Sequence, residues 1–579
     1  MFVAGAVLLP ATLAGQQPVV EPGGSAGQVC AEGVVTSIDI ERGSVFDPES
    51  TSVRALAWSY RLLNLLHVRT AESFVRRELL FAEGECLDPF LVSESQRLLY
   101  EHVFIDDAEI TDTVDVAGNR QVTVKTRDRW SLEVDVGITY DEGANLEKFQ
   151  VTEKNFLGQG ILGEFTHRER REQRTQGFRV FTPRLFGRTD ASIGAGRDRP
   201  GNFFNQYVRY PFVGETGEYS FRQGFDRSTK FFSYATDGAE PFTNVLTPSF
   251  RQVAELSLAK RLGEEGRSFM VGMTLTHDIV RFPRSPEITL LDDFDNPLLF
   301  PGPLPPAMSS QLLESGSTRM SLHAGTRRYR YEFYEGIDGL RDRLLVPLGF
   351  YAGVSVGRGL SVFIPDDVPG LDDYFGRARA SFGAPVGSSL LHGSFTLESR
   401  HDDGAFRDLL FDTDLVGYLR HEVIPGNVLF VRGSYGGGWN TRLPFQLSLG
   451  GREGVRSLVE DRFPGGRMAK FVVEDRLLFP WPRRGTIDLG ATLFWDIGRV
   501  WPGDVPYGVD SDWQSALGFG LRFGIPSTSR NVFRTDVAFP VDGGSPVFRF
   551  SFELNLLRQG FWTPDVFRSR RFDLGAEQF

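Results

Sequence analysis

The sequence predicts a membrane β-barrel of about 16 antiparallel strands, preceded by a small α+β domain of order β-α-α-β-β. Three observations lead to this fold class. From Trp130 onward, apolar and polar residues alternate with a period of two through most of the chain. Helical patterns are confined to the stretch before Trp130. After the first fifteen residues, no apolar run approaches the ~20 residues that a membrane-spanning helix requires.

Composition narrows the class of protein further. The 579 residues include 64 Gly and 50 Phe, and 24% are charged, so the chain is neither disordered nor collagen-like. The formal net charge is -12, and the two signs are mixed along the whole length. Because nucleic-acid binding needs a basic face, no nucleic-acid partner is expected.

The N-terminus has the character of a secretory signal peptide. Residues 1–15 are almost wholly apolar and end on small residues, although the first basic residue of the chain is Arg42. Residues 16–33 contain much Gln, Pro, Gly and Ser and are assigned to a linker. We therefore expect the chain to be exported.

A small soluble domain is predicted over residues 34–129, with an insertion at about residues 43–70. The patterns change from period two to helical periodicity and back again. Its elements, in chain order, are a strand at 34–40, a helix at 73–81, a helix that begins at Asp88-Pro89, and a hairpin that turns at Gly118-Asn119. The Asp-Pro pair is an N-cap followed by a first-turn proline, and Gly-Asn suits a tight hairpin turn.

The chain contains only two cysteines, Cys30 and Cys86. In an oxidising compartment they can form a disulfide, and elsewhere they are two buried thiols. A sequence does not give the separation of the two Cα atoms, so both alternatives stay open.

The barrel is assigned to residues 130–556. In the first strand, Trp130 to Tyr140, every second residue is apolar, and the aromatic residues at its two ends suit the two membrane interfaces. The last strand repeats the alternation, and its aromatic residues are Phe548, Phe550 and Phe552. Dividing the segment by about 27 residues per strand and connection gives about 16 strands.

A large soluble β-sandwich or propeller would show the same alternation. No blade-length repeat is visible, and the charged face is Gly-rich and continuous, which favours the lumen of a closed barrel. The Pro- and Asp-rich segment 284–317 cannot be a strand and is expected to be an extracellular loop. A tail at residues 557–579 follows the last strand.

Enzyme motifs are absent from the sequence. The eight His residues form no HExxH motif and no zinc-type spacing with Cys. The GxSxG string at residues 23–27 lies in the Gly- and Pro-rich linker, without a strand before it or a helix after it, so it is no nucleophile elbow. Acidic clusters at 292–295 and 366–373 lack the glycine-turn spacing of a calcium loop and are interpreted as solvated charge. We therefore expect no enzyme activity, no metal and no cofactor, and a lipid-modifying barrel enzyme is the least favoured alternative.

One acidic residue near the C-terminus is expected inside the barrel. The alternation of TIDLGATLFWDIG at residues 486–498 places Asp496 in the lumen, where a carboxylate needs a partner or water. Upstream, Gly450 and Gly451 permit a tight, non-strand course before Arg456. The forked guanidinium of arginine suits a carboxylate, so Arg456 is the candidate partner. From these residues alone, it can equally be one of many surface arginines.

These motifs resemble the bacterial surface-antigen barrel of the BamA/TamA superfamily of outer-membrane assembly and secretion proteins. That family has an inward-folded loop with a Val-Arg-Gly-aromatic motif after Gly-Gly, and here Ser457 and Leu458 replace the last two residues. The matching positions are Gly450, Gly451, Val455 and Arg456 in the loop, Glu474 and Arg476 in a Glu-x-Arg strand, and Phe494, Asp496 and Gly498 in a Phe-x-Asp-x-Gly strand. Residues 34–129 resemble a single POTRA domain.

The resemblance implies insertion of proteins into an outer membrane, or their translocation across it, without nucleotide use. It implies a periplasmic N-terminal domain, a lateral gate between the first and last strands, and an Arg456–Asp496 contact that holds the loop inside. The implied partners are the outer-membrane bilayer, unfolded β-barrel or secreted client proteins, and accessory assembly proteins of the periplasm. A passive outer-membrane pore with a periplasmic anchor domain is the alternative.

Overall fold

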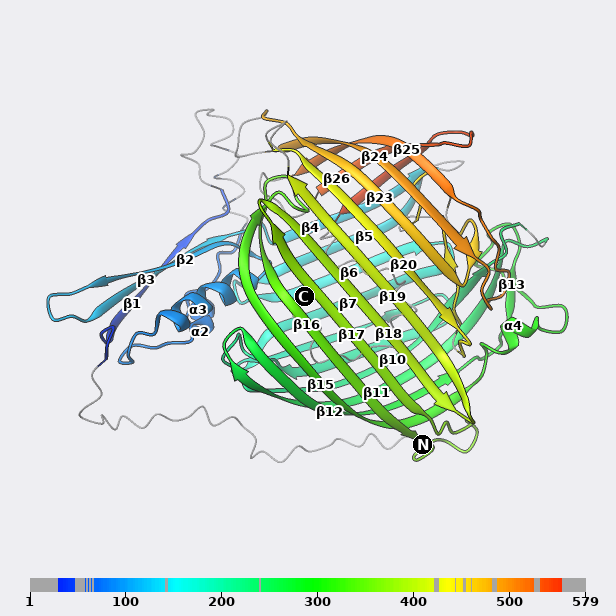
Figure 1. The fold of residues 1–579 in the computed structure, drawn as a ribbon, viewed down its shortest axis with the longest axis horizontal. Helices are drawn as coiled ribbons and strands as arrows, with labels where there is room; N and C mark the ends of the chain where they lie inside the picture. The colour runs from blue at the N-terminus through cyan, green and yellow to red at the C-terminus, as the bar shows by residue number, and fades with distance from the viewer. Residues whose placement is uncertain are drawn as a thin grey trace.

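The computed structural model describes residues 30–46, 58, 61, 64, 67–140, 144–238, 241–420, 426–442, 444–450, 454–459, 461–481, 487–524 and 532–553. The predicted signal peptide and the predicted tail lie outside these residues, as do most of the linker and of the insertion. The described part forms a small α+β domain at one end of a closed barrel (Figure 1).

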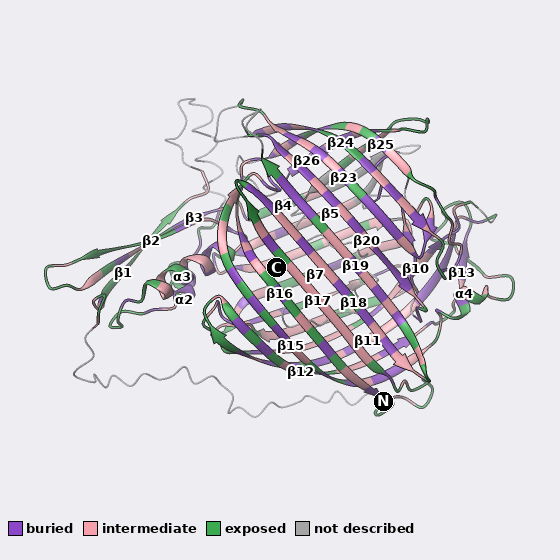
Figure 2. Cartoon of the chain, viewed as in Figure 1, coloured by how far each residue is buried: buried purple, intermediate pink, exposed green. Residues whose placement is uncertain are grey.

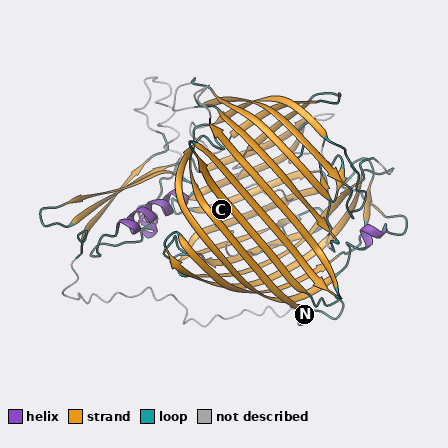
Figure 3. Ribbon diagram, viewed as in Figure 1, coloured by secondary structure: helices purple, strands orange, loops and turns teal. Residues whose placement is uncertain are grey.

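The small domain has the predicted order β-α-α-β-β. Its elements are β1 (Val35–Gly43), α2 (Glu72–Glu78), α3 (Pro89–Glu101), β2 (Ile105–Val114) and β3 (Arg120–Asp128). In the three-stranded sheet, β3 lies in the centre and pairs parallel with β1 and antiparallel with β2. The two helices lie beside this sheet, next to the mouth of the barrel (Figure 3).

Local signals explain how the domain folds. The Asp88 side chain accepts a hydrogen bond from the Phe90 N–H at 2.8 Å, which caps α3 as predicted. The helices bury their apolar faces on the sheet in one core, whose fully buried members include Phe74, Val75, Leu99, Ile105 and Val124. A disulfide joins Cys30 to Cys86, whose Cα atoms lie 5.3 Å apart.

The tip of the β2–β3 hairpin is exposed. Ala108 and Ile110 of β2 are buried, but Val114 at the end of β2 and Val116 beyond it are exposed. The hairpin projects beyond the two helices (Figure 1), so α2 and α3 do not cover its tip.

The barrel wall is a continuous antiparallel sheet closed between its first and last strands. The wall strands are β4 (Leu132–Tyr140), β5 (Ala144–Phe156), β6 (Ile161–Arg170), β7 (Gln173–Phe186), β8 (Thr189–Arg197), β9 (Asn202–Tyr210), β10 (Tyr219–Ala235), β11 (Asn244–Glu264), β12 (Arg267–Arg281), β15 (Ser315–Glu335), β16 (Arg343–Leu360), β17 (Tyr374–Val386), β18 (Ser389–Asp402), β19 (Ala405–Arg420), β20 (Val428–Trp439), β23 (Arg467–Leu478), β24 (Asp488–Trp501), β25 (Gln514–Gly524), β26 (Val532–Pro540) and β27 (Val547–Glu553).

The barrel class is confirmed, but the strand number is larger than expected. The closed sheet of the described residues contains 22 strands, of which β13 (Glu287–Thr289) and β14 (Leu298–Leu299) are short additions, leaving 20 in the wall. The estimate of about 16 assumed long connections of about 27 residues per repeat. Most hairpins are shorter, and β18 and β19 are separated by only two residues.

Burial alternates along the wall strands (Figure 2), as expected where successive side chains point to opposite faces of the sheet. On β12, the outward residues Phe269, Val271, Met273 and Leu275 are between 38% and 47% exposed and form an apolar surface. Charged residues face the interior, as in a transmembrane barrel. In the described part of the chain, no helix is long and apolar enough to cross a membrane.

The longest connections lie at the end of the barrel opposite the small domain (Figure 1). The segment predicted as a loop, 284–317, is mostly irregular, but it also contains β13, β14 and the short helix α4 (Pro306–Ser309). The expectation that it holds no strand is therefore wrong, because β13 pairs with β11 and β15 already begins at Ser315. A second long connection, between β20 and β23, contains β21 (Leu447–Ser448) and β22 (Pro464–Gly465).

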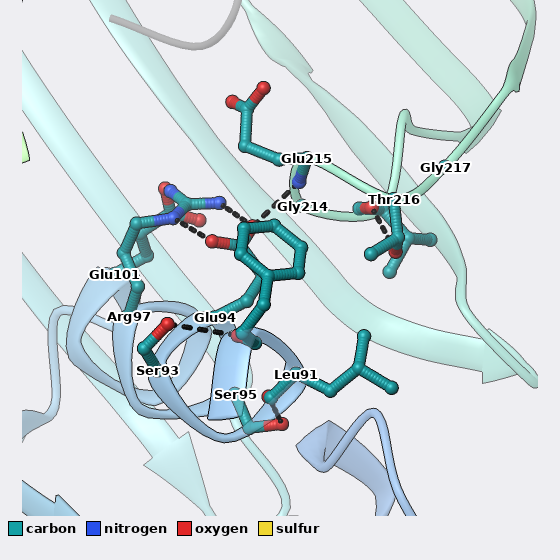
Figure 4. Close-up of polar contacts among 12 residues, drawn as sticks. Leu91, Ser93, Glu94, Ser95, Arg97, Glu101, Gly214, Glu215, Thr216 and Gly217 are labelled. Atoms are coloured by element: carbon teal, nitrogen blue, oxygen red, sulfur yellow. Dashed lines mark hydrogen bonds and ion pairs between the residues drawn. The ribbon is translucent and has the colours of Figure 1, made fainter. Parts of the chain in front are cut away.

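The small domain is fixed to the barrel by buried polar contacts. Glu94 of α3 accepts a hydrogen bond from the Glu215 N–H, in the β9–β10 connection, at 2.6 Å. Arg97 holds the other side of Glu94 at 2.8 Å, and Arg327 of β15 pairs with the Glu215 carboxylate at 2.9 Å (Figure 4 shows α3 against this turn). Next to β4, the Ala71 N–H donates to the Gly158 carbonyl at 2.8 Å.

A second junction contact should respond to acid. Glu78 is buried between His102 and Arg184, and although burial raises its pKa, these two groups lower the pKa of Glu78 to about 2. Because this value lies below the ordinary 4.5, the contribution of ionised Glu78 to the stability of the folded state is present above pH 4.5 and is lost as the pH falls toward 2.

We expect hydrogen exchange in α2 to rise over that range. Glu78→Gln should remove the acid step, while Glu72→Gln, on the exposed side of α2, should retain it; equal profiles for all three proteins would contradict the assignment.

Candidate functional site

The candidate site is built by the β20–β23 connection, which folds back into the barrel. The strands β21 and β22 pair with each other, and the Gly450 N–H donates to the Arg462 carbonyl at 3.0 Å, so the base of the loop is closed. A Cβ on Gly450 would lie 1.9 Å from the Val459 carbonyl oxygen, so only glycine fits there. Gly451, the other glycine of the predicted pair, lies outside the described residues.

The loop packs against the wall through apolar side chains. Val455 and Leu449 are fully buried in a cluster with Met468 of β23 and Val500 of β24. Gly498 of β24 makes this approach possible, because a Cβ there would lie 2.6 Å from the Leu449 side chain. The glycine of the Phe-x-Asp-x-Gly strand is therefore the position where the loop packs directly against the wall.

Arg456 points into a group of carboxylates on the wall. Its Nη2 lies 2.6 Å from Asp496 Oδ1 and its Nε lies 2.7 Å from Asp496 Oδ2, which is a two-point contact. Glu474 of β23 lies 3.0 Å from the same guanidinium, and Asp536 of β26 lies 3.3 Å away. The ring of Phe494 lies beneath the guanidinium, with 3.5 Å between the guanidinium carbon and the ring centroid.

Two further arginines complete the charge balance of the site. Arg534 of β26 donates to Glu474 at 2.8 Å and to Asp536 at 2.8 Å. Arg476 donates to the other oxygen of Glu474 at 2.9 Å. Three cations thus face three buried carboxylates, and each buried charge has a partner.

The last wall strand also contacts the loop. Arg549 of β27 donates from Nε to the Arg456 carbonyl at 2.7 Å and from Nη2 to the Leu458 carbonyl. Ser457 is buried, and Leu458 packs on the apolar cluster. The loop tip therefore lies inside the barrel even though Ser and Leu replace the Gly and aromatic residue of the resembled motif.

Sequence reasoning missed three contributors, namely Arg534, Asp536 and Arg549. Alternation alone places the first two on the inward face of β26, and the third on the polar face of β27. No motif distinguishes them from other inward charges, because their roles depend on strands that meet only after the barrel closes. To predict these three residues from the alternation, one would also need to know which residues of neighbouring strands lie opposite each other in the barrel.

The barrel closes at a seam between its first strand, β4, and its last strand, β27. The residues predicted for these two strands lie in different surroundings. Trp130 does not start β4 at the membrane interface; its ring lies 6.2 Å from Phe46 and 6.3 Å from His67, against the small domain. Phe548 and Phe550 of β27 are exposed, at 69% and 79%. Tyr140 is the last residue of β4 and Phe552 lies in β27. The side chains of these two residues are not among those described.

In the described residues, no group of three His, Cys, Asp or Glu side chains is arranged to hold a metal ion. The carboxylates of the site lie against arginines instead. Ion pairs between Arg456 and these carboxylates thus join the loop to the wall.

Comparisons with known proteins give only structural similarities. No protein-family profile and no curated protein matches the chain. It is similar to BamA from Haemophilus ducreyi lacking POTRA domains 1-3, with 15% identity, coverage of 89% of this chain and 84% of that chain, and a TM-score of 0.38. For CdiB from Acinetobacter baumannii the values are 12%, 90%, 73% and 0.39, and for CdiB from Escherichia coli they are 13%, 92%, 91% and 0.33.

Proposed function

We propose that this protein inserts proteins into an outer membrane or translocates them across it, through a lateral gate between β4 and β27. The observation that carries the proposal is that the inward loop contacts several C-terminal wall strands, including the last one. Arg456 binds carboxylates on β23, β24 and β26, and Arg549 of the last strand binds the loop backbone. A loop fixed in this way braces the strands next to the seam.

The seam itself supports a gate. The closed sheet pairs its first wall strand, β4, with its last, β27, so opening this one pairing turns the barrel into a sheet with two edges. Each backbone hydrogen bond contributes about 1 kcal/mol net, so one strand pairing can be exchanged for another at little net cost. An opened edge cannot be satisfied by lipid tails, but a client strand can pair with it. Exchange of one strand pairing for another requires no nucleotide.

The small domain fits the same role. It lies at the mouth of the barrel and leads into β4 through three residues, 129–131. The periplasm would then be the compartment on this side, where unfolded clients and accessory assembly proteins meet the domain. The disulfide between Cys30 and Cys86 is consistent with an oxidising compartment.

A passive pore with an anchor domain is the second candidate. A 20-stranded barrel is wide enough for an aqueous channel, which favours it. The inward loop and its buried charges favour the assembly role. Loss of charge-dependent conductance control on changing Arg456, with client assembly unaffected, would favour the pore.

The deciding experiment is depletion of the protein in its host, followed by quantitative proteomics of purified outer membranes. We expect a fall in other proteins of that membrane. A broad fall in barrel proteins would identify a general assembly factor, and loss of one secreted or surface protein would identify a dedicated translocator. An unchanged outer membrane would contradict the proposal and leave the passive pore.

A further inference from the structure

The turn between β15 and β16, residues 336–342, is largely buried. Its residues Ile337, Asp338, Leu340 and Asp342 are all at most 6% exposed. By contrast, Gly387, in the β17–β18 turn at the same end, has no atom within 4 Å of the position that a Cβ would take. The β15–β16 turn is therefore folded inward, not into the surrounding solvent.

The turn reaches strands far along the wall. Asp338 accepts hydrogen bonds from the Tyr418 hydroxyl of β19 at 2.6 Å and, through its carbonyl, from Arg522 of β25 at 2.8 Å. From β16 to β25 the wall order contains seven strand steps. At ~4.8 Å for each step, the path along the wall is about 34 Å. A seven-residue turn makes this contact only by crossing the lumen.

The crossing is held by both apolar and charged contacts. Ile337 packs in a buried cluster whose other members are Val346, Leu348, Leu390, Val416, Tyr418, Val428, Phe430 and Val472. Arg341 lies 3.0 Å from Asp488 of β24 and donates to the Phe479 carbonyl at 2.8 Å. The turn is a packed part of the interior.

The turn and the inward loop meet at two residues of β23. Arg476 donates from Nη1 to the Ile337 carbonyl at 3.0 Å and from Nε to Glu474 at 2.9 Å. The other oxygen of Glu474 lies 3.0 Å from Arg456. A chain of direct contacts thus links an element from one end of the barrel to an element from the other end.

We propose that the β15–β16 turn is a stopper that closes part of the lumen at the small-domain end, and that Arg476 and Glu474 keep the turn and the inward loop seated together. A barrel of this strand number would otherwise leave a channel for hydrated ions and small polar solutes. This inference holds whichever protein or solute the barrel handles, so it stands apart from the proposed assembly role.

The test is single-channel conductance of the full chain in planar lipid bilayers. Replacing residues 337–341 with Asn-Gly should raise the conductance severalfold, since the crossing is removed. Gly387→Asn changes a turn at the same end that crosses nothing and should match the parent. An assembled, shortened variant with the conductance of the parent would overturn the stopper.

A cysteine pair tests the placement if the shortened chain does not assemble. A Cβ on Gly524 of β25 would lie 3.6 Å from Leu340 Cδ1, so Leu340→Cys with Gly524→Cys should be joined by a short bifunctional thiol cross-linker in the intact barrel. Failure of this pair to cross-link with that reagent would show that the turn does not cross the lumen.

The link through β23 has its own readout. Arg476→Met should raise conductance as the shortened turn does, and combining the two changes should add little. Additive effects would show that the turn and the loop are independent, and would overturn the shared seating.

Discussion

Replacing Arg456 with alanine is expected to abolish the heat-resistant, fast-migrating form of the barrel on semi-native gels and to impair client assembly. The change removes a cation that contacts Asp496, Glu474 and Asp536 together. Breaking a buried ion pair from one side costs about 3–5 kcal/mol, because the remaining charge stays buried. The loop would lose its position in the lumen, and the last strand would lose its backbone partner on the loop.

The matched control lies on the same loop. Arg462 pairs with Asp237 at 3.1 Å, but its side chain is 47% exposed. Exposed pairs contribute about 0–1 kcal/mol, so Arg462→Ala should migrate and function as the parent does. Equal damage from the two changes would mean that the loop tolerates no substitution and that the lumenal contact has no special role.

Asp496→Ala tests the partner from the other side. It should be milder than Arg456→Ala, because Glu474 and Asp536 still face the guanidinium. The double variant should be less harmful than the sum of the two single effects. If the two effects simply add, Arg456 and Asp496 are not coupled, and the proposed role of their contact is wrong.

A disulfide across the seam is expected to abolish client assembly while the barrel remains folded. Val134 of β4 and Phe548 and Phe550 of β27 all point outward, so cysteine at position 134 is combined in turn with cysteine at 548 and at 550, and the pair that forms a disulfide on oxidation is used. A covalent bond at the seam prevents the edge from opening. Assembly of a radiolabelled client barrel should stop on oxidation and return on reduction.

The control disulfide belongs one strand away. Val537 and Phe548 are opposite each other on β26 and β27, so a cysteine pair there fixes two strands without closing the seam. This variant should assemble clients normally. The parent must be reduced in parallel, because reductant also reaches the Cys30–Cys86 disulfide. Normal assembly by a fully cross-linked seam variant would exclude a lateral gate.

The inward and outward faces could be predicted from the sequence, because alternation in a two-faced strand is a local property. On β24, Asp488, Phe494 and Asp496 are buried, and Leu493 and Trp495 are exposed, as the alternation predicts. The strand number could not be predicted in the same way. It depends on the lengths of the connections, which carry no periodic signal.

Contacts between distant segments were the other limit. Trp130 continues the apolar alternation of its strand, yet the docked small domain takes its ring away from the membrane. Nothing in the local sequence of 336–342 indicates that this turn crosses the lumen. The Arg456–Asp496 pair could be predicted only because both residues lie in recognisable motifs.

The attachment of the small domain makes the two sides of the seam unequal. The Ala71 N–H to Gly158 carbonyl bond and the Asn155 to Thr70 bond fasten the C-terminal end of β5 and the turn after it to the domain, and β5 pairs along β4. On the other side, β27 pairs with β26 and contacts the inward loop through Arg549. We therefore expect the barrel to open asymmetrically. The first strands would stay in place with the small domain, and the last strand would move away from them.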